Sequence, residues 1–350
     1  RPSPPAPLPE GEGGDHHLSP SGRRGNLGTV TTGGAGAYNG ECPCSLGERS
    51  LLSPIRSGPF STVTNPQHTL HTDHSRHWRE NTFVYPVLSR RSRGVSIGVN
   101  LNPDKVCNFD CIYCQVDRRS EAETRFVATE QLLTEIDAML GYVSSGALFA
   151  EDPFSTVPPQ LQRLNDIAFS GDGEPTTYRN IDQIVGEVAG LKKRHGLDDV
   201  KMVLITNASM FHRPACREAL QILDANNGEI WAKLDAGTAE YYQLIERTKI
   251  PFQRILDNIT EAARERPLVL QSLFMRVNGN PPSPEEIDAY CTRINEIQAA
   301  GGQLKLAQIY TVARPPAESF VSSLTDAEVD AIAEQVQRET GVPAECFYGG

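Results

Sequence analysis

The sequence predicts an α/β protein built on a parallel sheet, and two observations support this fold class. First, 39% of the 350 residues are hydrophobic and 22% are charged, as is typical of a globular protein with a large core. Second, from residue 95 onward, short runs rich in Val, Ile and Leu alternate with longer helical segments about six times. Such alternation indicates βα units, whose strands pair in parallel. Six units suit an incomplete barrel or a doubly wound sheet, and periodicity alone does not choose between them.

The elements can be predicted in chain order. Residues 95–101, VSIGVNL, predict a buried strand that ends before Asn-Pro, and residues 128–143 predict a helix with Thr129 as its cap. The other predicted strands are 166–170, 201–207, 229–236, 268–275 and 303–312. The other predicted helices are 180–195, 211–223, 251–266, 283–301 and 325–341. In either architecture, functional residues belong on the loops after the strands' C-terminal ends.

The N-terminal part of the chain differs in composition from the rest. Residues 1–62 are rich in Pro, Gly and other small residues, and such a segment buries too little apolar surface to offset its ordering entropy. The chain does not begin with Met, and its first Met is Met139. We therefore expect residues 1–62 to be disordered or a non-native extension. We expect residues 63–94 to form a basic and aromatic cap and residues 95–350 to form the core domain.

The charge distribution argues against broad nucleic-acid binding. Residues 1–94 hold 10 Lys and Arg against 7 Asp and Glu, which gives a charge of +3. Because the net charge of the whole chain is −11, residues 95–350 carry −14. Nonspecific binding to nucleic acid requires clustered Lys and Arg, although a local basic patch could still hold RNA. No apolar run approaches the length of a membrane span, and no charged segment leads into an apolar core at the N-terminus. We expect a cytoplasmic protein without membrane contact.

Three of the eight cysteines form a cluster, CNFDCIYC, with the spacing C-x3-C-x2-C at Cys107, Cys111 and Cys114. A zinc site would need a second cysteine pair, which the isolated Cys216, Cys291 and Cys346 do not provide. A chance group of buried thiols is a further alternative, but the loop is polar. An iron–sulfur cluster fits better, because three thiolates on a [4Fe–4S] cube leave one iron open for chemistry.

The cysteine spacing, with an aromatic residue just before the last cysteine, resembles the signature of radical S-adenosylmethionine (radical SAM) enzymes. The resemblance implies a partial (β/α)6 barrel and a [4Fe–4S] cluster on Cys107, Cys111 and Cys114. It also implies that S-adenosylmethionine (SAM) chelates the unique iron and is cleaved reductively to methionine and a 5′-deoxyadenosyl radical, which abstracts hydrogen from the substrate. Tyr113 would lie near the SAM adenine, with ordinary loop packing as its alternative role.

The segment FSGDGEPT, residues 169–176, is similar to the family's GGE element. That resemblance implies that Gly173 and Glu174 hold the SAM amino group, since glycine admits close backbone approach and a carboxylate suits an ammonium. Asp172 stands where the family has a glycine, so its own contact is not implied. An ordinary turn is the alternative for this segment.

Four further polar residues end predicted strands. The resemblance implies a ribose contact for Asn207, whose alternative is a turn residue. Lys233 and Asp235 are same-face neighbours on a strand and would contact SAM or substrate, or pair with each other. Arg314, after the last strand, would hold a substrate carboxylate or phosphate, or lie on the surface.

Residues 71–350 together resemble the Fe–S oxidoreductase group that is similar to wyosine-type tRNA-modifying radical SAM proteins. The candidate substrates are therefore a tRNA base and a small molecule, and the implied partners are SAM and a one-electron donor such as a flavodoxin or ferredoxin. A non-catalytic Fe–S or metal-binding electron carrier is the alternative class. A carrier would need neither the open iron nor Gly173 and Glu174.

The segment before residue 95 combines arginines with aromatic residues. We interpret it as a cap that closes the open barrel, with a phosphate-binding surface as the alternative. Its arginines are Arg76, Arg79, Arg90, Arg91 and Arg93. Three histidines at equal spacing, His71, His74 and His77, are a weaker candidate metal site.

Overall fold

The computed structural model describes residues 78–349 except 119 and 123. The predictions for residues 1–62, for the first part of the cap and for the three histidines fall outside these residues. The sheet strands are β1 (Val84–Ser89), β2 (Gly94–Val99), β3 (Leu164–Phe169), β4 (Lys201–Thr206), β5 (Gly228–Lys233), β6 (Leu268–Leu273), β8 (Leu304–Tyr310) and β10 (Ala344–Phe347). The α-helices are α2 (Thr129–Ser144), α3 (Ile181–Arg194), α4 (Pro214–Asp224), α5 (Ala239–Glu246), α6 (Phe252–Glu265), α7 (Pro284–Ala299) and α8 (Asp326–Thr340).

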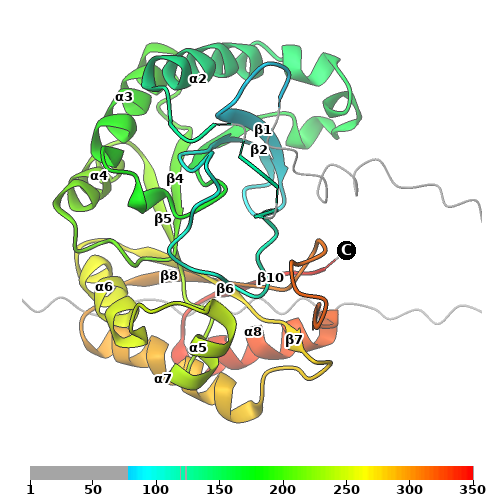
Figure 1. The fold of residues 1–350 in the computed structure, drawn as a ribbon, viewed down its shortest axis with the longest axis vertical. Coiled ribbons are helices and arrows are strands. Elements are labelled where there is room, and N and C mark those ends of the chain that lie inside the picture. The colour runs from blue at the N-terminus through cyan, green and yellow to red at the C-terminus, as the bar shows by residue number, and fades with distance from the viewer. Residues whose placement is uncertain (1–77, 119, 123, 350) are drawn as a thin grey trace, which may run out of the picture. The chain divides into compact units, whose positions relative to one another are not determined.

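These eight strands form one curled sheet in which spatial order follows chain order, β1-β2-β3-β4-β5-β6-β8-β10. The strands from β2 onward run parallel, and β1 pairs antiparallel with β2. A doubly wound sheet reverses its strand order at a switch point, which this sheet does not do. The predicted partial barrel is therefore confirmed, and its helices follow one another around the outer side of the sheet (Figure 1).

The two faces of the sheet are distinguished by alternation along each strand. In β4, Met202 and Leu204 belong to the large apolar core shared with the helices, whereas Val203 belongs to a small separate cluster. That second cluster contains Ala168, Val203, Trp231 and Val269. Side chains two residues apart share a face, so Lys233 lies on the same inner face as Trp231. The inner face of the sheet therefore carries polar side chains among a few apolar ones.

Local sequence explains where α8 begins. The Thr325 side chain accepts from the Glu328 backbone N–H, and the Glu328 carboxylate accepts in return from Thr325, so α8 starts with a capping box. At α2 the prediction was wrong. The cap position is Ala128 without a side-chain hydrogen bond, and Thr129 is already the first helical residue.

The described part of the predicted cap is built into the sheet. Residues 84–89 form β1, an edge strand that the arginine-rich composition did not predict. The turn after β1 reaches the opposite edge of the sheet, since Arg90 donates to the Tyr348 carbonyl at 2.6 Å and Arg93 lies 3.6 Å from Glu345. Between the described residues of β1 and β10 no strand pairing closes the barrel. These arginine contacts bridge the gap instead.

The sequence did not predict α5, β10 or the short antiparallel pair β7 (Arg276–Val277) and β9 (Val321–Ser322). Each has eight residues or fewer, which gives little periodic pattern to detect. Among the described residues, no helix is both long and apolar enough to span a lipid bilayer.

Candidate functional site

The cysteine loop follows β2 at the C-terminal end of the parallel strands, as the fold class predicts. The loop is fixed by backbone hydrogen bonds to the end of α5, from Asp110 to the Glu246 carbonyl at 3.1 Å and from Ile112 to the Ile245 carbonyl at 2.9 Å. All three thiols are partly buried and not in disulfides. They line one cavity of about 190 Å³ together with the loop of residues 170–174. The structure thus brings the two predicted cofactor motifs together.

A cation lies beside the thiols. Arg118 donates to the Phe109 carbonyl at 3.2 Å and lies 3.6 Å from the Cys114 sulfur, while its Nε is buried without a partner among the described residues. Burial raises the pKa of the Cys107 thiol, which Arg118 partly opposes. A guanidinium in this position favours thiolates and a negatively charged cluster.

The residues present fit an iron–sulfur cluster with three thiolate ligands. Soft thiolates on one cavity wall are the donor set that such clusters need. Among the described residues, no three His, Cys, Asp or Glu side chains are grouped closely enough to hold a single metal ion. A [4Fe–4S] cluster does not need its ligands to converge on one ion, because each thiolate ligates a separate iron.

The opposite wall of the cavity passes close to the cysteine loop at two glycines. A Cβ on Gly173 would lie 2.2 Å from the Val106 carbonyl oxygen, immediately before Cys107. A Cβ on Gly171 would lie 2.2 Å from Oδ1 of Asn100. At Gly173 the obstructing atom is backbone, so glycine is required there for the two loops to pack as they do, whereas at Gly171 the nearest atom belongs to the Asn100 side chain.

Glu174 is buried, with 4% of its surface exposed, and its carboxylate joins its own loop to the end of β4. Its Oε1 accepts from the Thr176 N–H at 3.1 Å and from the hydroxyls of Thr176 and Thr206, both at 2.5 Å. Its Oε2 accepts from the Asn207 N–H at 2.7 Å. Burial raises the pKa of this carboxyl, although these hydrogen bonds oppose the shift. Oε2 accepts only one of these bonds and keeps capacity for a further donor from the cavity.

Asn207 connects the β4 end to the cysteine loop. Its Nδ2 donates to Asn108 Oδ1 at 2.9 Å, and its Oδ1 accepts from the Ser209 hydroxyl at 2.6 Å. The amide therefore orders the loops around the cavity that it lines.

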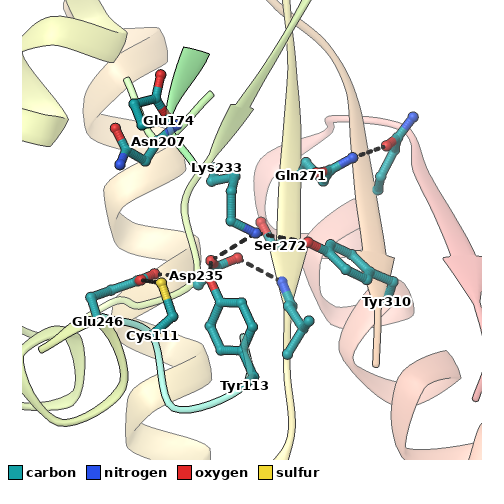
Figure 2. A network of polar contacts seen from close by, with 12 residues as sticks. Cys111, Tyr113, Glu174, Asn207, Lys233, Asp235, Glu246, Gln271, Ser272 and Tyr310 are labelled. Atoms are coloured by element: carbon teal, nitrogen blue, oxygen red, sulfur yellow. Dashed lines mark hydrogen bonds and ion pairs between the residues drawn. The ribbon is translucent and has the colours of Figure 1, made fainter. Parts of the chain in front are cut away.

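On the other side of the cysteine loop lies a charged network (Figure 2). Lys233 Nζ lies 3.2 Å from Asp235 Oδ2 and donates to the Tyr310 hydroxyl at 2.8 Å. Asp235 also accepts from the Leu273 N–H at 2.7 Å and from the Tyr113 hydroxyl. Burial lowers the pKa of Lys233, but Asp235 and its other neighbours outweigh that effect, so the pKa is raised and the amine stays charged. Lys233 and Asp235 thus pair with each other, as one of the two sequence interpretations expected.

Glu246, at the end of α5, completes this network and was not predicted from the sequence. Its Oε2 accepts from the Cys111 thiol at 2.6 Å, and its Oε1 accepts from the Tyr113 hydroxyl at 3.3 Å. Burial, followed by repulsion from Asp235, raises the pKa of Glu246 to about 8. No local motif marks this residue, because its partner Cys111 lies 135 positions earlier.

A second cavity of about 290 Å³ lies inside the barrel and includes Arg314 among its lining residues. It shares Ser170, Gly171 and Ile205 with the cavity of the cysteines, so the two are contiguous. The loop of Arg314 also contacts the cysteine loop, since the Gln115 side chain donates to the Arg314 carbonyl at 3.1 Å. The structure therefore offers a cofactor cavity that adjoins a space for a second molecule.

Comparison with known proteins gives a family match. A sequence model described as the radical SAM superfamily matches residues 101–291, more than half of the chain. The matched segment includes the three cysteines, the loop of Glu174 and both partners of the Lys233–Asp235 pair.

Individual relatives are more distant. A protein described as GTPase Obg from Brachyspira hyodysenteriae is 24% identical over 252 residues, covering 70% of this chain and 32% of that protein. A UPF0026 protein from Helicobacter pylori is 26% identical over 220 residues, covering 60% of this chain and 62% of that protein. This chain thus spans less than two thirds of either relative. A structure of TYW1 with a lysine-pyruvate adduct bound has 15% identity and a TM-score of 0.43, covering 78% of this chain and 80% of that one.

Proposed function

Because this chain belongs to the radical SAM superfamily, whose enzymes use a [4Fe–4S] cluster and SAM, we propose that Cys107, Cys111 and Cys114 are its cluster ligands. The observation that carries this proposal is that all three thiols line one cavity with Gly173 and Glu174. When bound, the reduced cluster supplies the electron that cleaves SAM to methionine and a 5′-deoxyadenosyl radical, which takes hydrogen from the substrate.

The chain's own residues have separate tasks in this proposal. Gly173 lets its loop pack against the cysteine loop where both line the cofactor cavity, and Glu174 Oε2 accepts from the SAM ammonium. Asn207 holds the β4 loop against the cysteine loop, and we assign it to the ribose contact.

Residues of the charged network form the remaining wall of this cavity. Tyr113 and Lys233 line it near the cysteines. Asp235 holds Lys233 charged. We assign Tyr113 to the adenine contact and Lys233 to the polar end of the ligand.

The substrate and the electron donor belong to the proposal as well. The contiguous barrel cavity is the space for the substrate, and a flavodoxin or ferredoxin would deliver the electron. A reducing cytoplasm suits a thiolate-bound cluster, so we propose that location. The family match favours this enzyme over a non-catalytic carrier. The two candidate substrates for this space are a tRNA base and a free small molecule.

Anaerobic reconstitution with iron and sulfide, followed by reduction and addition of SAM, tests the proposal. We expect 5′-deoxyadenosine from the unaltered protein and background levels from Cys111→Ala, whose cluster absorbance should also fall. Cys346→Ala is the matched control, because this thiol lies on β10 and does not line the cavity. Absence of 5′-deoxyadenosine despite an intact cluster would contradict the proposal.

A further inference from the structure

Arg91 is the feature of the barrel interior that the cofactor chemistry does not use. It follows β1 in the turn that leads to β2, and it lines the 290 Å³ cavity. It also lines a third cavity, of about 400 Å³, toward the other end of the strands, together with Asp166 and Trp231. Arg91 thus lies where these two interior spaces meet.

Aromatic rings hold the Arg91 guanidinium in place. Its Cζ lies 5.6 Å from the Trp231 ring centroid and 5.2 Å from that of Tyr310. Among the described residues, its side chain has no hydrogen bond or ion pair. A guanidinium has five N–H donors in a rigid fork that suits carboxylate and phosphate. The two aromatic rings therefore hold the Arg91 guanidinium by cation–π contacts, and its N–H donors remain available to another group.

The charge around Arg91 points the same way. The charged residues that line the 290 Å³ cavity are Arg90, Arg91, Arg314 and Asp166. Burial, and then repulsion from Arg91, lowers the pKa of Arg90. No acid is among the causes of this shift, so the positive charges of the two arginines are not offset there. The single acid, Asp166, is buried and accepts from the Ser96 hydroxyl, and burial raises its pKa. The lining of the 290 Å³ cavity therefore has an excess of positive charge, which would stabilise an anion.

We propose that the barrel interior binds a small organic anion as the substrate, with Arg91 as the anchor of its carboxylate or phosphate. This rests on the proposed function, because the substrate lies in the cavity contiguous with that of the cysteines. A volume of about 290 Å³ is that of a small-molecule pocket, which favours a free small molecule over a nucleic-acid segment.

The test uses benzoate and its neutral isostere benzamide as probes. Each is titrated by calorimetry into the anaerobically reconstituted full chain. We expect benzoate to bind at least about tenfold more tightly than benzamide, because a charge-assisted pair with Arg91 is worth about 1.5 kcal/mol or more. In Arg91→Gln this preference should disappear, and in Arg91→Lys it should be reduced.

Arg163→Gln is the matched control. This arginine is exposed and contacts the same turn through the Arg93 carbonyl at 3.5 Å, but it does not line the interior cavities, so the preference for benzoate should persist. Equal binding of the two probes, no binding of benzoate, or an unchanged preference in Arg91→Gln would overturn the proposal. So would displacement of benzoate by unfractionated tRNA that depends on Arg91, because the anion would then be an RNA phosphate.

The proposal and the proposed function fail separately in these measurements. Probe binding requires no turnover, and 5′-deoxyadenosine formation is measured in parallel on the same preparation. If the nucleoside forms but Arg91 has no effect on benzoate, only the anion site is wrong. If Arg91 selects benzoate but SAM is not cleaved, the proposed function is wrong. Thermal unfolding of Arg91→Gln shows whether the variant remains folded.

Discussion

On one side of the cysteine loop, Glu174 is surrounded by neutral donors, whereas on the other side Asp235 pairs with Lys233 and a second acid, Glu246, acts on that lysine from farther away. Glu174 accepts four hydrogen bonds from backbone and hydroxyl groups, two from Thr176 in its own loop and two from the end of β4 and the residue after it. Asp235 has a full counter-charge in Lys233, and Glu246, which raises the pKa of that lysine, lies close enough to act on it as well.

The difference teaches how each side can tolerate change. Neutral donors that point at one carboxylate have no alternative acceptor when it is removed, and each buried donor then remains unsatisfied. Lys233 has a second acid nearby in Glu246, whose pKa is raised in part by repulsion from Asp235. Neutralising Asp235 removes that repulsion and favours the charged form of Glu246, so the lysine keeps an acid partner. We therefore expect a substitution at Glu174 to lower the free energy of unfolding more than a substitution at Asp235.

The largest effect is expected from Glu174→Ala. It leaves the Thr206 hydroxyl and the Asn207 N–H without an acceptor, so the free energy of unfolding should fall by about 3 to 5 kcal/mol. Urea unfolding of the cofactor-free chain measures this. Glu187→Ala, on the exposed face of α3, is the control and should stay within about 0.5 kcal/mol of the unaltered protein. A loss for Glu174→Ala below about 1 kcal/mol would show that its donors find other partners.

Gly173→Ala tests how tightly the Glu174 loop packs on the cysteine loop. The added Cβ would meet the Val106 carbonyl at 2.2 Å, so we expect a loss of about 2 to 3 kcal/mol and less cluster per protein after reconstitution. Iron and sulfide content per chain measures the second effect. Gly190→Ala in α3 is the control, because its Cβ would meet only Arg194 at 3.9 Å and alanine favours a helix. Full cluster content in Gly173→Ala would show that the cysteine loop can shift.

Asp235→Asn should cost less, about 1 to 2 kcal/mol, because the Leu273 N–H keeps an acceptor and Glu246 remains near Lys233. Together with Glu246→Gln, the loss should exceed the sum of the single losses, since Lys233 then has no acid partner in the network. A double-mutant cycle by urea unfolding measures this coupling. Strictly additive losses, or a single Asp235→Asn loss as large as that of Glu174→Ala, would contradict the expectation that Glu246 compensates for Asp235.

The smallest effect is expected from Arg118→Gln, which removes a cation from beside the thiols while leaving both carboxylate regions intact. Reduction adds negative charge to the cluster, so losing the cation should make its midpoint potential more negative by about 30 mV, or about threefold in the equilibrium. An anaerobic redox titration followed by electron paramagnetic resonance measures the shift. Arg125→Gln, on an exposed side chain of the following segment, should leave the potential unchanged. A shift of equal size in both variants would mean that only net charge matters.

The long helices were predictable because their patterns are long. The predicted 180–195 and 325–341 differ from α3 and α8 by one residue at each end. The strand β1 and the helix α5 were missed for different reasons. Arginines and aromatic residues around 78–93 suggested a cap rather than an edge strand, and α5 has only eight residues. The site followed the same division. Cys107, Cys111, Cys114 and Glu174 belong to short motifs. Glu246 belongs to none, and Arg91 was marked only as one arginine of the basic segment, with phosphate binding as its alternative role.

The sequence by itself determined the order of βα units, the loop that carries three thiols and the glycines that admit a close backbone approach. These depend on local spacing and on the chemistry of single residues. The resemblance implied an open barrel, which periodicity left undecided and the structure confirmed, but only the tertiary structure decided that Cys111 meets Glu246. It also decided that Arg91 enters the interior between Trp231 and Tyr310. Those contacts join residues more than a hundred positions apart. Buried polar groups cost free energy unless they meet partners, and which partners meet is set by the fold and not by any local pattern.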